Sequence, residues 1–165
     1  MSSPLFPGAD VRYGAMSDDA TARHEAIVDL FGRYLMWLRR RNHESTRTLT
    51  EDSVARSKLG AIQRRPFDGA SELADDEREV AILLAEASAD RFIRSFFHFL
   101  NHQGTDFPLG EGHHLRFRLE VEVSRNRDGE IVERDVINRG GARCLHDYWG
   151  RWINRAGDEI APASE

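Results

Sequence analysis

The stretch Asp90-Arg-Phe-Ile-Arg-Ser-Phe-Phe-His-Phe-Leu-Asn-His-Gln103 is the most apolar run in the chain, and Gly104 follows it directly. At 100° per residue, its apolar side chains share one arc of a helix and its polar side chains share the other. The apolar arc holds Phe92, Ile93, Phe96, Phe97, Phe99 and Leu100. Burying one phenylalanine side chain contributes roughly 1.5–3 kcal/mol. We therefore expect an amphipathic helix that buries its phenylalanine face at the centre of the core and stops at Gly104.

A first helix is predicted well upstream of this stretch. Apolar residues recur at helical spacing from Ile27 to Leu38, and the serine and two aspartates of 17–19 suit the start of a helix. We expect three arginines in its last turn, because cations favour the negative end of the helix dipole. These are Arg39, Arg40 and Arg41.

A polar loop is predicted over 42–48, followed by a second helix over 51–63. Thr50 is the expected cap of that helix. Pro66 should end it, because the residue before a proline disfavours the helical conformation.

A third helix is predicted to begin over 71–75. Its apolar residues project to nearly the opposite side from the phenylalanines that follow, which leaves two alternatives: a break near 87–90, or one long helix buried on different sides along its length. These apolar residues are Val80, Leu83, Leu84 and Ala87. Either alternative places the helix between two layers.

The hydrophobic period changes to two after a glycine-containing loop over 104–114. Strict alternation over 115–124 predicts a half-buried strand, and Asp128-Gly129 predicts a hairpin turn. A return strand follows over 130–138; its mixed pattern leaves the register open and allows a bulge. Since a two-stranded hairpin is marginal alone, we expect a third strand from the N-terminal arm or from a second copy, which suggests a homodimer through a sheet edge.

The chain is predicted to close with a short helix stopped by Gly157. Its core side carries Leu145, Tyr148, Trp149, Trp152 and Ile153. The expected fold is therefore α+β, with three to four helices followed by an antiparallel β-hairpin and a C-terminal helix. One domain should span 17–157, with a loose arm over 1–16 and a frayed tail over 158–165.

Composition describes an ordinary globular chain of 165 residues, 40% hydrophobic and 31% charged. It has no run of 18 apolar residues, so we expect no membrane span, and no secretory signal is recognised. The lone cysteine, Cys144, agrees with a reducing cytoplasm. Lys58 is the single lysine among 23 basic residues, a bias that suggests a GC-rich bacterial genome.

Charge is unevenly distributed along the chain. Residues 33–65 hold nine basic and three acidic residues, a net +6, so the remainder carries −11 to give the overall −5. Such a chain can present a basic patch to an anionic partner, although solvated helix faces explain the pattern equally simply. From Arg39 to Arg65 the basic stretch has no aromatic residue and no recognition helix, so we do not expect nucleic acid as the partner.

One histidine constellation has metal-ligand spacing. His98 and His102 are four residues apart on the polar face of the phenylalanine-rich helix, which is how a helix offers two ligands to zinc or iron. A third ligand could come from the following loop, which contains Glu111, His113 and His114. An open fourth position would then allow hydrolytic or oxidative chemistry. However, the intervening Phe-Leu-Asn provides no general base within the motif.

Cys144, His146 and Asp147 form a second constellation, with a nucleophile, a base and an acid close in sequence. Catalytic groups of this kind normally come from separate segments. We therefore interpret Cys144 as a small, buried residue at the start of the last helix.

The leading hypothesis is a non-enzymatic bacterial protein that binds another protein, in a regulatory or toxin-neutralising (immunity-type) role. It rests on the missing catalytic signature, the acidic balance and the separated charge. The expected partner-binding residues are Glu120 and Glu122 of the strand together with the three arginines at 39–41, and no cofactor is expected. The alternative is a zinc- or iron-dependent hydrolase or oxidase built on the histidine constellation.

Overall fold

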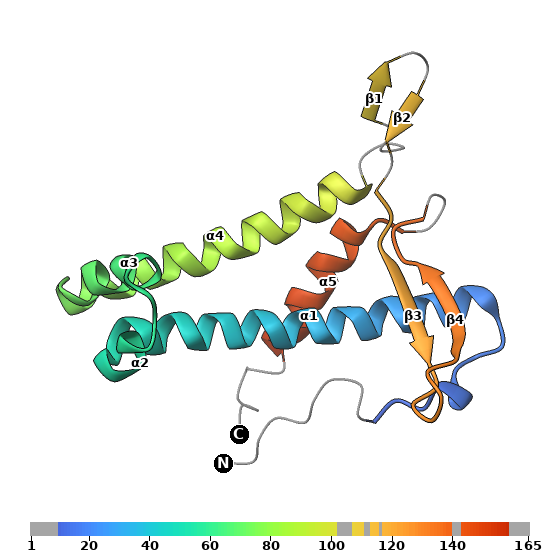
Figure 1. Ribbon diagram of the computed structural model, residues 1–165, viewed down its shortest axis with the longest axis horizontal. Coiled ribbons are helices and arrows are strands. Elements are labelled where there is room, and N and C mark those ends of the chain that lie inside the picture. The colour runs from blue at the N-terminus through green and yellow to red at the C-terminus, as the bar shows by residue number, and fades with distance from the viewer. Residues whose placement is uncertain (1–9, 102–106, 111–112, 116, 140–142, 159–165) are drawn as a thin grey trace. The chain divides into compact units, whose positions relative to one another are not determined.

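The computed structural model describes residues 10–101, 107–110, 113–115, 117–139 and 143–158. The protein is a mostly helical α+β structure in which helices precede a two-stranded antiparallel hairpin and a C-terminal helix, as the sequence predicted (Figure 1). The chain divides into two compact units. Unit 1 comprises Met1–Met36 and Arg94–Glu165, and unit 2 comprises Trp37–Ile93. The prediction of one domain over 17–157 stays a prediction.

Helix α1 (Ala20–Glu51) begins where the sequence placed a helix start. The backbone N–H of Ala22 donates to the Asp19 carboxylate at 2.8 Å, which satisfies one of the N–H groups that a helix leaves open at its first turn. The third strand expected from the N-terminal arm does not form over residues 10–16. A 3₁₀ turn, η1 (Tyr13–Ala15), lies there, and the Tyr13 hydroxyl donates to Glu133 at 2.6 Å.

The predicted hairpin is confirmed, with corrected bounds. β3 (Glu120–Ser124) pairs antiparallel with β4 (Ile131–Val136), and Gly129 in the turn has φ 71°, a conformation that glycine adopts without strain. The register shifts beside Ser124, which leaves Val132 unpaired as a bulge. No third strand joins β3 and β4 among the residues that the structure describes.

The predicted strand over 115–124 is too long, and the predicted loop over 104–114 is wrong in part. Two short antiparallel strands, β1 (Phe107–Gly110) and β2 (His113–Leu115), form a separate ribbon. Residues 117–119 are not in a strand, although the carbonyl of Leu119 accepts from the backbone N–H of Ile137 at 3.0 Å. The Asn138 side chain accepts from the backbone N–H of Leu119 at 2.7 Å and donates to the carbonyls of Leu100 and Phe117, both at 3.1 Å.

The mixed pattern of β4 follows from acidic residues at its inward-facing positions. Asp135 is buried and its carboxylate accepts from the Nδ1 of buried His24 in α1 at 2.6 Å. Glu133 forms an ion pair with Arg23 of α1 at 3.6 Å. A buried carboxylate is tolerated only with such partners, so the alternation of apolar residues that marks β3 is replaced here by polar pairs.

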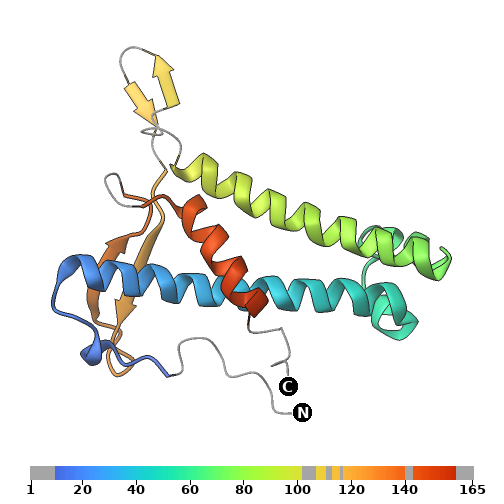
Figure 2. The same cartoon turned by 180° about the vertical axis from the view of Figure 1, so that it is seen from behind.

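The core of unit 1 is aromatic. Helix α5 (Leu145–Asp158) lies against α1 and the C-terminal end of α4 (Asp75–Asn101), as Figure 2 shows. Phe97 of α4 is 2% exposed, and the rings of Phe31, Trp149 and Trp152 meet it edge-on at centroid distances of 6.0 to 6.2 Å. Such edge-to-face pairs are favourable beyond the area they bury. The predicted core side of the last helix is confirmed, although α5 runs through Gly157 to Asp158 instead of stopping at the glycine.

The predicted burial of the whole phenylalanine face is wrong. Phe97 and Leu100 are buried, whereas Phe92 is 71% exposed, and Phe96 and Phe99 are also exposed. The six apolar residues spread over a wide arc, and a helix that packs on one side covers only part of such an arc. Phe96 stacks on Phe99 at the edge of the covered side, with ring centroids 6.4 Å apart.

Unit 2 departs most from the sequence predictions. α1 continues as a helix through the predicted loop at 42–48, so the three arginines at 39–41 lie in its middle. Thr50 belongs to α1, and Asp52 is the cap of α2 (Ser53–Ser57) instead, accepting from the backbone N–H of Val54 at 2.8 Å. Contacts across to α4 hold the polar segment helical, since Arg47 lies within it and pairs with acidic residues of that helix.

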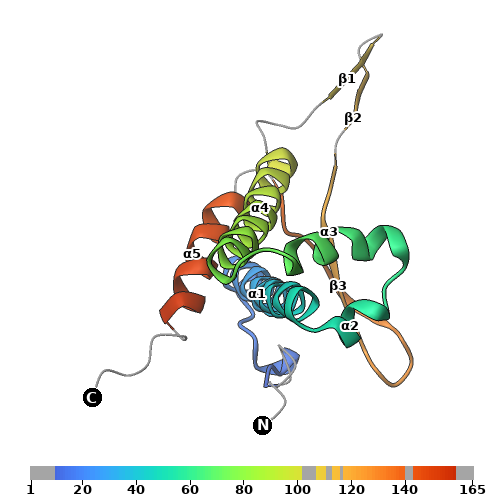
Figure 3. The same ribbon diagram turned by 90° about the vertical axis from the view of Figure 1, so that its left-hand side faces the viewer.

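Helix α3 (Ala61–Ser71) contains Pro66, so the prediction that this proline ends a helix is wrong. α2 and α3 lie beside the end of α1 (Figure 3). The Arg56 guanidinium of α2 donates to the carbonyl of Thr50 at 2.6 Å and forms an ion pair with Asp68 of α3 at 3.4 Å. α4 is one unbroken helix, which settles the alternatives left open over 87–90.

Candidate interaction surface

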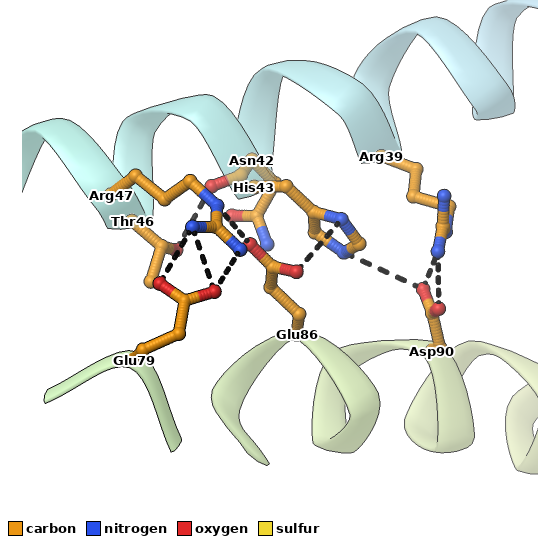
Figure 4. Close-up of polar contacts among 8 residues, drawn as sticks. All are labelled: Arg39, Asn42, His43, Thr46, Arg47, Glu79, Glu86 and Asp90. Atoms are coloured by element: carbon orange, nitrogen blue, oxygen red, sulfur yellow. Dashed lines mark hydrogen bonds and ion pairs between the residues drawn. The ribbon is translucent and has the colours of Figure 1, made fainter. Parts of the chain in front are cut away.

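Unit 2 joins α1 to α4 through a row of charged side chains, which we call the ion ladder. Arg39, His43 and Arg47 are spaced four residues apart on α1 and therefore share one face. Their partners on α4 are Glu79, Glu86 and Asp90. Figure 4 shows the two sets of side chains pointing toward each other from antiparallel helices.

The ends of the ion ladder have strong geometry. Arg39 donates to both oxygens of Asp90, from Nε at 2.7 Å and from Nη2 at 2.6 Å. Arg47 donates from Nε to Glu86 at 3.0 Å and from Nη1 to Glu79 at 3.0 Å. Paired guanidinium–carboxylate contacts of this kind are stronger than neutral hydrogen bonds and fix the geometry of both partners.

The centre of the ladder is a histidine between two carboxylates. His43 Nδ1 lies 3.8 Å from Glu86 and its Nε2 lies 3.6 Å from Asp90. The hydrogen bonds to Asp90 and to Glu79 raise the pKa of Arg39 and of Arg47 above the ordinary arginine value, and partial burial opposes both shifts. The two arginines face three carboxylates, and His43 lies between two of these carboxylates.

A neighbouring side of α4 carries four exposed apolar residues. Val80 is 55% exposed, Leu83 50% and Leu84 63%, and Ala87 is exposed on the same side. We call these four residues the interaction stripe. The sequence identified them as one side of a helix, but predicted that this helix lies between two layers; in unit 2 the charged side faces α1 and the stripe faces outward.

Part of the basic stretch at 33–65 is neutralised within unit 2. Arg39 and Arg47 are in the ion ladder, and Arg56 and Arg64 both pair with Asp68, Arg64 at 2.9 Å. Acidic residues that lie later in the sequence thus neutralise arginines that precede them. Local charge counting could not detect this compensation.

The predicted partner-binding residues lie in different places. Arg39 is held by Asp90, whereas the guanidinium of exposed Arg41 lies 5.0 Å from the centre of the Trp37 ring, and Arg40 is exposed beside it. Glu120 and Glu122 are on the exposed face of β3, and Glu122 accepts from Arg134 at 2.9 Å. Their role in binding stays a prediction.

The predicted metal ligands are only partly described. His98 is exposed, as expected, and its ring lies 5.4 Å from that of His146, edge to face. His113 is exposed on β2; His102, Glu111 and the side chain of His114 lie outside the described residues. Within the described part of the chain no three histidine, cysteine or acidic side chains are grouped to hold a metal ion. The zinc or iron site stays a prediction that elemental analysis would test.

The second constellation is partly assembled. The His146 Nε2 lies 3.3 Å from the Asp147 carboxylate, and Cys144 is a half-buried free thiol just before α5. Cys144 accepts backbone hydrogen bonds from Asp147 and Tyr148 through its carbonyl, at 3.0 and 3.3 Å. These contacts confirm the position of Cys144 at the start of the helix, whereas its predicted burial is only partial.

Comparison of the chain with protein-family models, with curated proteins and with solved structures finds no match. Among the described residues, no helix has the length and apolar character needed to cross a membrane. Any functional proposal therefore depends on the geometry of the chain itself.

Proposed function

We propose that this protein is a non-enzymatic module that acts by binding protein, and that the interaction stripe is its contact surface. One observation carries the proposal: unit 2 places charged side chains between its helices and large apolar side chains on its outside. Ordinary amphipathic helices do the reverse. A contiguous apolar surface that remains exposed in a folded chain is typical of a docking site.

The energetics support the same proposal. Leu83 and Leu84 are each at least half exposed, and burial of apolar surface contributes about 25 cal/mol per Å². Each ion pair of the ladder stabilises unit 2 by less than the burial of a leucine would, because partly exposed ion pairs contribute on the order of 1 kcal/mol or below. A protein that covers the stripe would therefore add stabilisation that unit 2 does not obtain from its own interior.

The finer proposal is a regulatory or toxin-neutralising role of the immunity type. The net charge of −5 and the exposed acidic face of β3 favour a basic partner at that second surface. Charges at the rim of an interface mainly accelerate association. We therefore expect neutral substitutions of Glu120 and Glu122 to slow binding of that partner and to weaken its salt dependence.

Site-specific photo-crosslinking tests the contact surface. A photoreactive residue at Leu84 should give discrete covalent adducts in the native host, because a bound protein lies against this position. The same residue at Glu44, an exposed position of α1 in the same unit, is the matched control and should give none. Absence of a discrete adduct at Leu84, or the same products at both positions, would overturn the proposal.

A further inference from the structure

The interaction stripe is symmetric about its own midpoint, which lies between Leu83 and Leu84. Val80 precedes this midpoint by as many residues as Ala87 follows it. At 3.6 residues per turn the four side chains therefore occupy a narrow arc that a half-turn about the midpoint maps onto itself. A two-fold symmetric contact uses the same patch on both copies, so an apolar patch on one helix face can pair with its own copy.

Opposite charges extend the same arc at its two ends. Asp76 lies four residues before Val80, and Arg91 lies four residues after Ala87, so both fall on the face of the stripe. Both are exposed, and neither forms an ion pair with another described residue. By contrast, Asp75 lies off this face and pairs with Arg78 at 2.9 Å.

We infer that the interaction stripe is occupied by a second copy of this chain, with the two α4 helices antiparallel. This inference rests on the proposed function and names the partner at the same surface. Two-fold symmetry about the midpoint brings the leucines of the two copies together at the centre of the contact and pairs Asp76 with Arg91 twice. A parallel pair would instead oppose like charges at both ends, so charge selects the antiparallel arrangement.

The contact differs from the homodimer through a sheet edge that the sequence suggested. It uses helix faces in unit 2, and helices pack by interlocking side chains of this kind. The leucines supply the attraction, and the charged ends set the direction and the register.

Sedimentation velocity of the full chain over a wide concentration range tests the inference. The wild-type protein should show a concentration-dependent dimer, and Leu84→Glu should sediment as a monomer at every concentration. Because Leu84 is exposed, its substitution should leave the circular dichroism spectrum unchanged, which separates loss of pairing from loss of folding.

Charge reversal tests the register. Asp76→Arg and Arg91→Asp should each weaken the dimer at least tenfold, since each single change creates two like-charge contacts. The double variant should recover most of the lost affinity, because the same pairs return with their signs exchanged. Asp75→Arg is the matched control: it makes the same charge change in the same helical turn, off the face, and should leave dimerisation within about twofold of wild type.

The outcomes separate the inference from the proposed function. A wild-type protein that stays monomeric, or a double variant no better than the single variants, overturns the antiparallel dimer. If the Leu84 crosslink still yields one discrete adduct with a different protein, the proposed function stands and only the partner changes. If neither a dimer nor an adduct forms, both fail.

Discussion

Unit 1 and unit 2 differ in how many hydrophobic side chains they bury. Among the described residues, unit 1 buries nine hydrophobic side chains, whereas unit 2 buries one, Ile82, and exposes eight large ones. The nine are Ile27, Val28, Phe97, Leu100, Ile137, Leu145, Tyr148, Trp149 and Trp152. Hydrophobic burial is the dominant favourable contribution to folding, so unit 1 can be stabilised by its interior, while unit 2 depends on ion pairs and on whatever covers its apolar exterior.

Substitution of two phenylalanines of the same helix should give the largest difference in stability between the two units. Phe97→Ala should cost about 3–5 kcal/mol of unfolding free energy, because it empties the centre of the aromatic core. Phe92→Ala, in unit 2, should stay within about 0.5 kcal/mol, because its side chain is mostly exposed. Urea denaturation of both variants measures the difference. Equal losses would show that Phe92 is covered in solution.

A second comparison concerns the closest approach of two helices in unit 1. A β-carbon on Gly32 of α1 would overlap the indole atoms Cε2 and Nε1 of Trp152 in α5. Gly32→Ala should therefore cost about 3 kcal/mol, since a buried indole has no room to move. In unit 2, Gly69 of α3 has open space around it, so Gly69→Ala should stabilise the helix by about 0.5–1 kcal/mol. Thermal unfolding of the two variants measures both effects. Two neutral changes would contradict the close contact between Gly32 and Trp152.

Alkaline pH should lower the stability of unit 1, because one of its tyrosines, Tyr148, ionises. Burial, together with the hydrogen bond from the Tyr148 hydroxyl to Glu25 at 2.5 Å, raises the pKa of Tyr148 to about 12 from an ordinary 10.0. Because the folded-state pKa is the higher one, this stabilisation is present in full below pH 10 and is lost as the pH rises toward 12. The loss should be about 2 kcal/mol.

The measurement is the free energy of unfolding as a function of pH. Tyr148→Phe removes the ionisable group, so its stability should fall less steeply between pH 10 and 12 than that of the wild type. Parallel curves would mean that Tyr148 has the same pKa in the folded and unfolded states.

The smallest expected effect tests the ion ladder itself. Asp90→Asn should cost about 1–2 kcal/mol, because it leaves the half-buried Arg39 without its charged partner. Glu122→Gln is the matched control, because the Glu122–Arg134 pair is exposed on the hairpin and should contribute below about 1 kcal/mol. Added salt should reduce the cost of the Glu122 change more than that of the Asp90 change. If salt instead reduced the cost of the Asp90 change more, the ion ladder would be fully exposed to solvent.

Much of the fold could be predicted from local pattern. Asp-Gly in the hairpin turn, the alternation over β3 and the aromatic side of α5 depend on nearest neighbours in sequence, and each was confirmed. Helix ends were predicted poorly in unit 2. The polar segment at 42–48 resembles a loop, yet Arg47 keeps it helical by pairing with residues far along the chain.

The candidate site shows the same division. Periodicity alone placed Val80, Leu83, Leu84 and Ala87 on one side of a helix, but it could not say whether that side is inside or outside. The usual assumption, that apolar residues face inward, failed because Glu86 and Asp90 on a neighbouring side meet arginines of α1. Acidic residues at 79, 86 and 90, spaced seven and four apart and therefore on one side of the helix beside an apolar stripe, were the available signal.

The sequence by itself determined the secondary structure of the hairpin and of the last helix, the amphipathic character of α4, and the charge balance, since each depends on residues that are near one another in the chain. Only the tertiary structure decided which face of α4 is covered, which phenylalanine forms the core, and which arginines are neutralised. Those outcomes depend on pairs such as Arg39–Asp90 and Gly32–Trp152, whose members lie far apart in sequence. Their interaction energies exist only once the chain has brought them together.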